Sequence, residues 1–341
     1  MLHSMKAMVL RAPWELVADE VSRPAPGSHD VLVRVTHSGI CGTDFKIYSG
    51  AIPVSYPRIM GHEMVGEVVE AGDTSFRAGD RVIIDPELYC GACFHCRIGQ
   101  THLCPKGMLV GRDAHGGFAE FLSAPSSQVF RMPDAIDSRT GPLIQVLTTC
   151  LHAQRQINIF PGESVVVFGL GVTGQLHVQL AKARGASPVI GVTRSAEKRA
   201  LAETLGAAVT IAGGDGAVDA VRDATEGRGA DVIIETTGVL PSVASSIKMA
   251  RFGGRLLLFG IITAKEGALP FYDLYFKELS LISARVAKSE DYPSAIALVQ
   301  RGTVKLEPLV SDVMPLGELK AAIDLLGSDN AQRMKIILDH G

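Results

Sequence analysis

The stretch "ESVVVFGLGVTGQLHVQLAKARGA", residues 163–186, joins an apolar run to three spaced glycines and a segment with helical periodicity. The run Val-Val-Val-Phe at 165–168 is typical of a buried strand, and the glycines follow it in the pattern G-x-G-x-x-G. Glycines at this spacing let the backbone approach a pyrophosphate at the N-terminus of a helix, so the stretch predicts a dinucleotide-binding strand–turn–helix unit. The residues expected to bind the cofactor here are Gly169, Gly171, Val172, Thr173 and Gly174.

Strands and helices are expected to alternate after this stretch. Apolar runs predict strands at 187–193, 231–238, 254–260 and 278–286, and helical patterns lie between them at 195–207, 219–227 and 240–254. Such alternation implies a parallel sheet with right-handed crossovers. We therefore predict an α/β, doubly wound Rossmann domain over residues 151–290.

The end of the second predicted strand bears on the choice between NAD and NADP. NAD-binding domains place an acid there, about 20 residues after the glycines, to accept hydrogen bonds from the ribose hydroxyls. In "VIGVTRSAEKR", residues 189–199, Thr193 and Arg194 occupy this place. Because an arginine pairs with a 2′-phosphate that an acid would repel, NADP is the preferred prediction. Alternatively, Arg194 stacks on adenine and NAD remains usable.

The overall composition limits the class of partner. A chain of 341 residues predicts about two domains, and its 33 basic and 36 acidic residues include no Lys/Arg run. This balance argues against nucleic acid or an anionic membrane as partner. The first residues lack the apolar core of a signal peptide, and no run of about 18 apolar residues occurs. We expect a cytoplasmic protein with a small-molecule ligand.

Four of the six cysteines lie in "CGACFHCRIGQTHLC", with the spacing C-x2-C-x2-C-x7-C. Thiolates about 2.3 Å from a tetrahedral Zn²⁺ suit such tight turns, and a reducing compartment disfavours disulfides. An iron–sulfur cluster and incidental surface thiols are the alternatives. Four thiolates leave no open coordination position, so this zinc is predicted to be structural. Its expected ligands are Cys90, Cys93, Cys96 and Cys104.

A second set of metal ligands is suggested by Cys41 in "CGTD" and by His62 and Glu63 in "GHEMVGEVVEAG". A thiolate, an imidazole and a carboxylate can hold zinc with one position open. Taken alone, His62 and Glu63 are more simply explained as a surface pair. Cys150 lies in a helix-like run and is expected to be a buried apolar residue rather than a ligand.

The motif order "GICGTD", "GHEMVGEVVEAG", the four-cysteine loop and "FGLGVTG" resembles that of the zinc-dependent medium-chain alcohol and polyol dehydrogenases over essentially the whole chain. The resemblance implies a GroES-like β-rich catalytic domain at residues 1–150, followed by the Rossmann domain. It also implies that residues 291–341 return to the catalytic domain, that the active site lies between two lobes, and that the chain forms homodimers or homotetramers.

The resemblance also implies roles for individual residues of the candidate site. Cys41 and His62 match the catalytic zinc ligands, and Glu63 matches the acid that ligates the metal or lies just behind it. Asp44 matches an acid that orients His62, and Thr43 matches the hydroxyl that passes on the substrate proton. In the simpler alternative, Asp44 and Thr43 only cap the turn.

Three positions depart from the family pattern or stay ambiguous. Lys46 stands where relatives often continue the proton relay with a histidine, and it either contacts the ribose or is solvated. Gln145 stands where polyol and threonine dehydrogenases carry a glutamate near zinc, so water, Glu63 or a substrate oxygen is expected at the fourth position. Lys335 lies where relatives bring a cation to the pyrophosphate, although an exposed strand lysine explains it equally well.

The resemblance predicts an oxidoreductase that carries two zinc ions per chain and transfers a hydride between a secondary alcohol, most plausibly a polyol, and NADP or NAD. Threonine-type amino-alcohol dehydrogenation is the alternative reaction. A catalytically inactive nucleotide-binding regulatory protein and a zinc-free quinone reductase are disfavoured by the presence of Cys41, His62 and Glu63.

Overall fold

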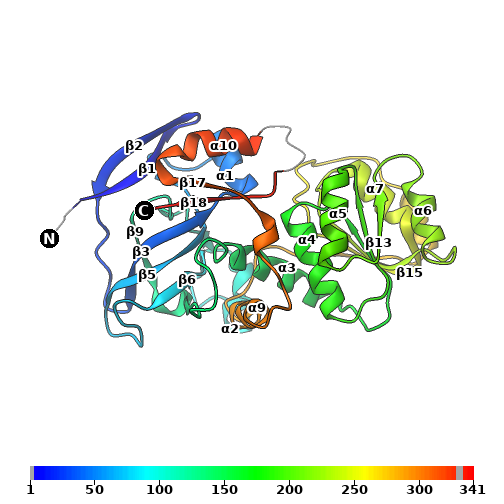
Figure 1. Cartoon of the computed structure of the whole chain (residues 1–341), viewed down its shortest axis with the longest axis horizontal. Helices are drawn as coiled ribbons and strands as arrows, with labels where there is room; N and C mark the ends of the chain where they lie inside the picture. The colour runs from blue at the N-terminus through cyan, green and yellow to red at the C-terminus, as the bar shows by residue number, and fades with distance from the viewer. Residues whose placement is uncertain (1–3, 328–332) are drawn as a thin grey trace. The chain divides into compact units, whose positions relative to one another are not determined.

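The computed structural model describes residues 4–327 and 333–341, and the chain divides into two compact units (Figure 1). Unit 1 comprises Met1–Thr148, Lys288–Arg301 and Leu309–Gly341, and unit 2 comprises Thr149–Ala287 and Gly302–Pro308. Each unit has its own hydrophobic core. The two units are described separately below.

Unit 1 is built mainly from antiparallel strands, as expected for a GroES-like domain. A three-stranded sheet has the order β2 (Glu15–Ser22), β1 (Ser4–Ala12), β4 (Arg58–Ile59). A seven-stranded sheet has the order β10 (Val129–Arg131), β6 (Arg81–Ile84), β5 (Glu63–Ala71), β3 (Asp30–Gly39), β18 (Lys335–Asp339), β17 (Val310–Pro315), with β9 (Phe121–Pro125) also paired to β3. A small ladder joins β7 (Glu87–Leu88) to β8 (Met108–Leu109).

Short helices complete unit 1. They are α1 (Gly42–Tyr48), α2 (Phe94–Arg97), α9 (Asp291–Gln300) and α10 (Leu319–Gly327), while α3 (Leu143–Ile157) begins in unit 1 and ends in unit 2. Helices α1 and α10 pack on β1 and β18 around the buried Leu10, Ile47 and Ile323. This core holds α1, and therefore the residue that precedes it, Cys41, against the end of β3.

Unit 2 contains the predicted Rossmann sheet, with six parallel strands. Their order is β13 (Val209–Ala212), β12 (Val189–Thr193), β11 (Val165–Phe168), β14 (Ala230–Glu235), β15 (Ala250–Leu258), β16 (Ser280–Ser283). The strands expected at 187–193, 231–238, 254–260 and 278–286 are confirmed, whereas β13 was not expected. It is a four-residue edge strand with one buried side chain, so it carries little apolar pattern.

Helices cover both faces of this sheet (Figure 1): α4 (Val172–Ala183), α5 (Ala196–Leu205), α6 (Ala217–Asp223), α7 (Leu240–Met249), with the short α8 (Phe271–Phe276) before β16. Side chains alternate along a strand, so Val165 and Val167 of β11 pack with α3, α4 and α5, and Val166 packs with α6 and α7. The helix predicted at 240–254 ends earlier, at Met249, because β15 begins at Ala250.

One boundary of the predicted C-terminal segment needs correction. Residues 302–308 belong to unit 2, although the sequence placed all of 291–341 with the catalytic domain. The Gln179 side chain donates to the Lys305 carbonyl at 3.1 Å and accepts from the Lys305 amide at 2.7 Å. Val304 and Leu306 are buried on either side of it. These contacts attach the segment to α4.

Candidate active site

Cys41, His62 and Glu63 lie together in unit 1, and one ligand atom from each falls within 4.8 Å of the others. Cys41 is the residue before α1, His62 immediately precedes β5, and Glu63 is the first residue of β5. The β3–β5 ladder pairs Gly39 with Glu63. A Cβ at Gly39 would lie 2.1 Å from a Glu63 carboxylate oxygen, so only glycine leaves room for this carboxylate. The donor set of one thiolate, one imidazole and one carboxylate fits a zinc ion.

Asp44 connects two of these residues. Its carboxylate is fully buried, accepts a hydrogen bond from the Cys41 amide at 2.8 Å, and lies 3.4 Å from Nδ1 of His62. Burial alone would lower the pKa of His62, but Asp44 and Cys41 together outweigh it and hold that pKa well above its usual value. Since Asp44 faces Nδ1, Nε2 is the ring nitrogen left for a metal.

Lys335 lies in this cluster and not at an exposed strand position, so that interpretation is wrong. Its Nζ donates to both carboxylate oxygens of Glu63 at 2.8 Å and to the Ile40 carbonyl at 3.1 Å. The pyrophosphate contact expected for Lys335 is corrected for the same reason, since these three acceptors occupy its ammonium. Burial lowers the pKa of Lys335, but Glu63, Cys41 and Asp44 together oppose it more strongly, so the pKa is raised and the amine stays charged.

The remaining predicted residues of unit 1 lie on two helices. Thr43 and Lys46 are half-buried and one turn apart on α1, which places them on the same side of that helix. Gln145 is buried in the first turn of α3. Cys150 is fully buried in the same helix, and burial raises the pKa of its thiol, so the interpretation of Cys150 as an apolar core residue is confirmed.

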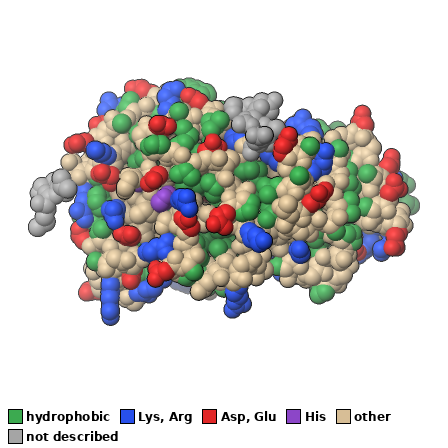
Figure 2. All heavy atoms as spheres, viewed as in Figure 1, with side chains coloured by type: hydrophobic (Ala, Val, Ile, Leu, Met, Phe, Trp, Pro, Cys, Tyr) green, Lys and Arg blue, Asp and Glu red, His purple; other side chains and the backbone are tan. Residues whose placement is uncertain are grey.

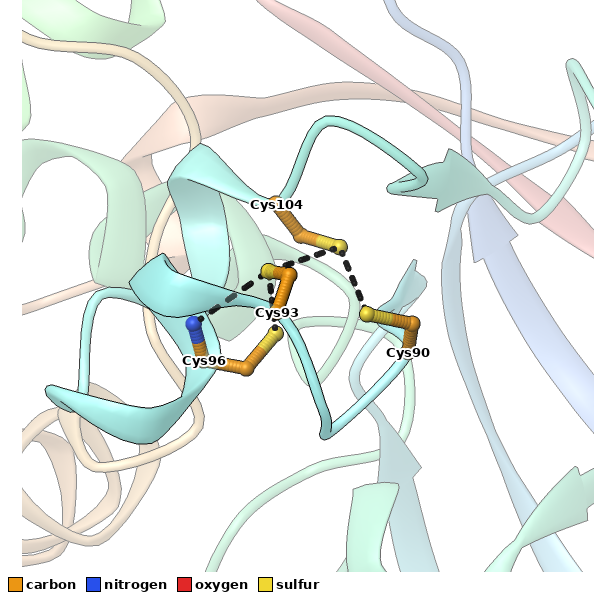
Figure 3. Close-up of side chains that lie close together, drawn as sticks. All are labelled: Cys90, Cys93, Cys96 and Cys104. Carbon is orange, nitrogen blue, oxygen red and sulfur yellow. Dashed lines mark hydrogen bonds between the residues drawn. The ribbon is translucent and has the colours of Figure 1, made fainter.

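The four cysteines of the loop at 90–104 point their sulfur atoms toward one another (Figure 3). The Sγ–Sγ distances are 3.5 Å for Cys93–Cys96, 3.9 Å for Cys93–Cys104 and 3.6 Å for Cys90–Cys104. Thiolates 2.3 Å from one tetrahedral zinc lie about 3.8 Å apart, so the spacing fits a single zinc ion. A cluster in which each thiolate binds a different iron needs wider separations. Hydrogen bonds from the Ala92 and Cys93 amides lower the pKa of Cys90 to about 6, which favours the thiolate that zinc requires.

The glycine turn of unit 2, residues 169–174, joins β11 to α4, and its three glycines make close approaches or leave open space where other residues would not. Gly169 has φ +94°, and a Cβ there would lie 2.5 Å from Oγ1 of Thr236. A Cβ at Gly174 would lie 2.0 Å from the Gly169 carbonyl oxygen, so this glycine lets α4 pack on β11. A Cβ at Gly171 would meet nothing within 4 Å, and Gly171 precedes Val172 and Thr173 at the start of α4 without a side-chain cap. The amides of this helix start are therefore accessible to a phosphate.

A cavity of about 550 Å³ lies beside this turn, and Thr193 and Arg194 line it. Two residues here were not predicted from the sequence. Asp215, in the glycine-rich loop after β13, also lines the cavity. Arg199 donates to the carbonyls of Thr193 and Arg194 at 3.0 and 2.9 Å and so fixes the end of β12. The run "GGDG" at 213–216 is the signal that could have indicated Asp215.

On the face shown in Figure 2, acidic and basic side chains are interspersed. Within the described ranges 4–327 and 333–341, no helix combines the length and the apolar character needed to cross a membrane.

Comparison with known proteins gives the same family for both units. Residues 27–134 match the family model for the alcohol dehydrogenase GroES-like domain, and residues 172–301 match that for zinc-binding dehydrogenase. The chain is 31% identical to a 2-dehydro-3-deoxy-L-galactonate 5-dehydrogenase of Pseudoalteromonas atlantica, covering 92% of this chain and 93% of that one. It is 30% identical to a sorbitol dehydrogenase of Halalkalibacterium halodurans, covering 98% and 99%.

A crystal structure of a zinc-binding dehydrogenase from Sinorhizobium meliloti, bound to NADP, is 33% identical with a TM-score of 0.92, covering 98% of this chain and 99% of the other. Likeness of this extent in sequence and fold, added to two thiol-containing clusters that could each hold a metal ion, identifies the family. The chain belongs to the zinc-dependent medium-chain alcohol and polyol dehydrogenases, which are NAD(P)-dependent oxidoreductases.

Proposed function

We propose that this protein interconverts a secondary alcohol of the polyol or sugar-acid class with its ketone, using NADP(H) in preference to NAD(H). The observation that carries the proposal is the cluster of Cys41, His62 and Glu63, which could hold a zinc ion and still leave at least one coordination position for the substrate oxygen. The names of the sorbitol and deoxygalactonate dehydrogenases to which the chain is similar support this class of substrate.

The residues of the site have distinct proposed roles. Zinc, when bound, supplies a Lewis acid that makes an alcohol hydroxyl more acidic, and oxidised nicotinamide supplies the hydride acceptor. Cys41 and His62 would hold the metal, and Asp44 would keep His62 oriented through Nδ1. Thr43, on the first turn of α1, would accept the hydroxyl proton. It would pass its own proton on towards the nicotinamide ribose, and Lys46, one turn further along the same side, would contact that ribose.

Glu63 is proposed to support the metal from behind rather than to bind it permanently. Lys335 already contacts both of its carboxylate oxygens, so a direct Glu63–zinc bond would compete with a buried ion pair. Lys335 also changes the charge of the site. Cys41 and Glu63 alone would cancel the two charges of zinc, and Lys335 adds one positive charge that offsets the buried Asp44 carboxylate, so the site does not become net negative before the substrate oxygen ionises.

The preference for NADP rests on the end of β12. Among the described residues, Arg194 has no carboxylate partner, so its guanidinium is available to a 2′-phosphate. Arg194→Ala should weaken NADP binding by roughly 1.5 to 3 kcal/mol, the scale of a charge-assisted hydrogen bond, and leave NAD binding nearly unchanged. Isothermal titration with both nucleotides measures this. Equal losses would show that Arg194 does not contact the phosphate.

We also propose that the chain self-associates through unit 2, as a homodimer or a homotetramer built from such dimers. Strand β16 is an edge of the six-stranded sheet, and Leu281 on it is exposed. Beside it Phe252, Tyr272 and Phe276 form an exposed aromatic cluster, with ring centroids 5.5 to 5.7 Å apart. The exposed edge strands of two identical chains can pair with each other about a two-fold axis, because such an interface uses the same surface of both subunits. Tyr272→Glu should shift the molar mass measured by light scattering towards the monomer.

The reaction is tested with a panel of polyols, sugar acids, simple secondary alcohols and L-threonine, each with NADP and with NAD, by following formation of reduced nicotinamide. Turnover of a polyol or sugar acid with NADP is the expected result. Turnover of L-threonine alone would replace the proposed substrate, and no turnover by a zinc-loaded preparation would contradict the proposal. Because thiolate zinc sites need a reducing compartment, we place this activity in the cytoplasm.

A further inference from the structure

Glu235 is a buried carboxylate in unit 2 that has no role in the family mechanism described above. It is the last residue of β14 and is fully buried. Among the described residues, no Lys, Arg or His forms an ion pair with it. A buried carboxylate without a cation is costly unless several hydrogen bonds satisfy it, so its partners indicate what it is for.

Those partners all belong to the turn that follows β14. One carboxylate oxygen accepts from the Thr237 amide at 2.8 Å and from the Thr237 hydroxyl, and the other accepts from the Gly238 amide at 3.0 Å. The backbone carbonyl of Glu235 accepts from the amides of Phe259 and Gly260, both at 2.9 Å. Glu235 therefore joins the turn after β14 to the turn after β15.

The turn after β14 lies without spare room against both the glycine turn and the turn after β15. The Thr236 hydroxyl donates to the carbonyls of Phe168 and Gly169, at 3.1 and 3.0 Å. A Cβ at Gly169 would lie 2.8 Å from Cγ2 of Thr237, and a Cβ at Gly260 would lie 2.1 Å from the Gly238 amide nitrogen. A shift of the segment 236–238 would thus displace the backbone of the glycine turn.

The same segment forms one wall of the cavity that contains Arg194. Thr237 lines this cavity together with Gly169 and Arg194. The position is the carboxyl end of neighbouring parallel strands, where β11 and β14 adjoin and the chain order of the sheet reverses. We infer that Glu235 is a positioning residue for the dinucleotide, because its carboxylate fixes Thr237 and Gly238 and thereby the shape of the glycine turn.

The charge of Glu235 matters in this role. An ionised carboxylate offers only acceptors, which matches three converging donors. A glutamine at 235 would turn its NH₂ group towards either the Thr237 or the Gly238 amide, where two donors would face each other. Glu235→Gln should therefore loosen the turn while keeping the size of the side chain.

The matched control lies on the same strand. Asp231, at the other end of β14, accepts from the Ser164 amide and hydroxyl at 2.8 and 2.6 Å and from Arg251 at 2.6 Å. Asp231→Asn therefore perturbs an equally well-bonded carboxylate of unit 2 away from the dinucleotide cavity. It reports what loss of stability alone does to nucleotide binding.

The test measures Kd for NADP by titration calorimetry, together with kcat, both KM values and Tm. Glu235→Gln should raise Kd and KM for the nucleotide at least tenfold, with KM for the alcohol and kcat at saturating nucleotide within about twofold of the parent. Asp231→Asn should lower Tm without changing Kd. An unchanged Kd in Glu235→Gln, or an equal change in Asp231→Asn, would overturn the inference.

A second pair of variants applies if Glu235→Gln does not fold. Thr237→Val removes the hydroxyl donor to Glu235, and Thr237→Ser keeps it. Valine should weaken nucleotide binding and serine should restore it, whereas equal binding by both would overturn the inference. The inference rests on the proposed nucleotide site. If that proposal failed, the parent enzyme would bind neither NADP nor NAD, which distinguishes this outcome from a failure of the inference alone.

Discussion

Lys335 and Glu63 form a buried ion pair behind the candidate catalytic metal site, and each depends on the other. Removing one partner of such a pair leaves an uncompensated buried charge. Lys335→Met should lower the free energy of unfolding by about 3 to 5 kcal/mol, measured by urea denaturation in zinc-containing buffer. The double variant Lys335→Met with Glu63→Gln should recover much of this loss. Lys320→Met, which breaks an exposed pair with Asp324, should change little.

Gln145 offers a second test at the scale of single residues. The family resemblance puts residue 145 near zinc, so a glutamate there is expected to add a negative charge to the proposed metal site and to oppose ionisation of the alcohol. Gln145→Glu should shift the pH profile of kcat/KM for alcohol oxidation towards alkaline pH with zinc still bound. An unshifted profile at full zinc occupancy would show that residue 145 does not sense the metal and would reassign Gln145 to binding substrate hydroxyls.

At the scale of elements, substitutions at two glycines of one turn should both weaken nucleotide binding but should differ in their effect on stability. Gly174→Ala forces a Cβ to within 2.0 Å of the Gly169 carbonyl and should cost about 1 to 3 kcal/mol of stability as well as nucleotide affinity. Gly171→Ala meets open space, so Tm should be unchanged while nucleotide affinity falls. Calorimetric titration and thermal melts of both variants distinguish the two effects. Equal melting temperatures would mean that α4 does not depend on the close approach at Gly174.

Loss of zinc from the four-cysteine loop should affect stability, whereas loss of zinc at Cys41 should affect turnover. Cys104→Ser should reduce zinc from two ions per chain to one and lower Tm by several degrees, because structural zinc contributes folding free energy directly. Cys41→Ala should also lose one zinc but abolish turnover while sparing Tm. Metal analysis, melts and activity of both variants are the measurements. A fully metallated parent with one zinc per chain would contradict the assignment of two sites.

The local patterns predicted elements well, and long-range pairing explains what they missed. The glycine turn and four of the other strands of unit 2 follow from local apolar periodicity. The position of Lys335 does not, because it depends on β18 pairing with β3, about 300 residues earlier in the chain. The role of Glu235 depends on turns from two neighbouring strands. The sequence next to Lys335 or Glu235 carries no pattern that would predict these long-range contacts.

At the scale of the whole molecule, the pH dependence of stability should show the effect of Asp85. This side chain is 2% exposed, and burial raises its pKa to about 6, although hydrogen bonds from Ser289 and the Glu87 amide oppose this. The folded state then binds the proton more tightly than the unfolded state. The stabilisation that comes from protonation of Asp85 is therefore fully present below pH 4 and is lost as the pH rises through 6.

Asp85→Asn should remove this dependence. The difference in unfolding free energy between Asp85→Asn and the parent should grow in favour of the variant by about 2 kcal/mol between pH 4.5 and 7. Urea denaturation at several pH values measures it, with the exposed change Asp134→Asn as control. A constant difference across this range would show that Asp85 is not protonated in the folded protein.

The short segment 302–308, which returns to unit 2 between two stretches of unit 1, limits how this enzyme can be rebuilt. The backbone passes between the units after Thr148, Ala287, Arg301 and Pro308, so no single cut separates them. A chimera that exchanges only residues 149–287 would leave Gln179 facing a foreign partner in place of Lys305. Transfer of unit 2 into a relative therefore requires both residues 149–287 and residues 302–308. A chimera made with a single crossover point would lack one of these two segments.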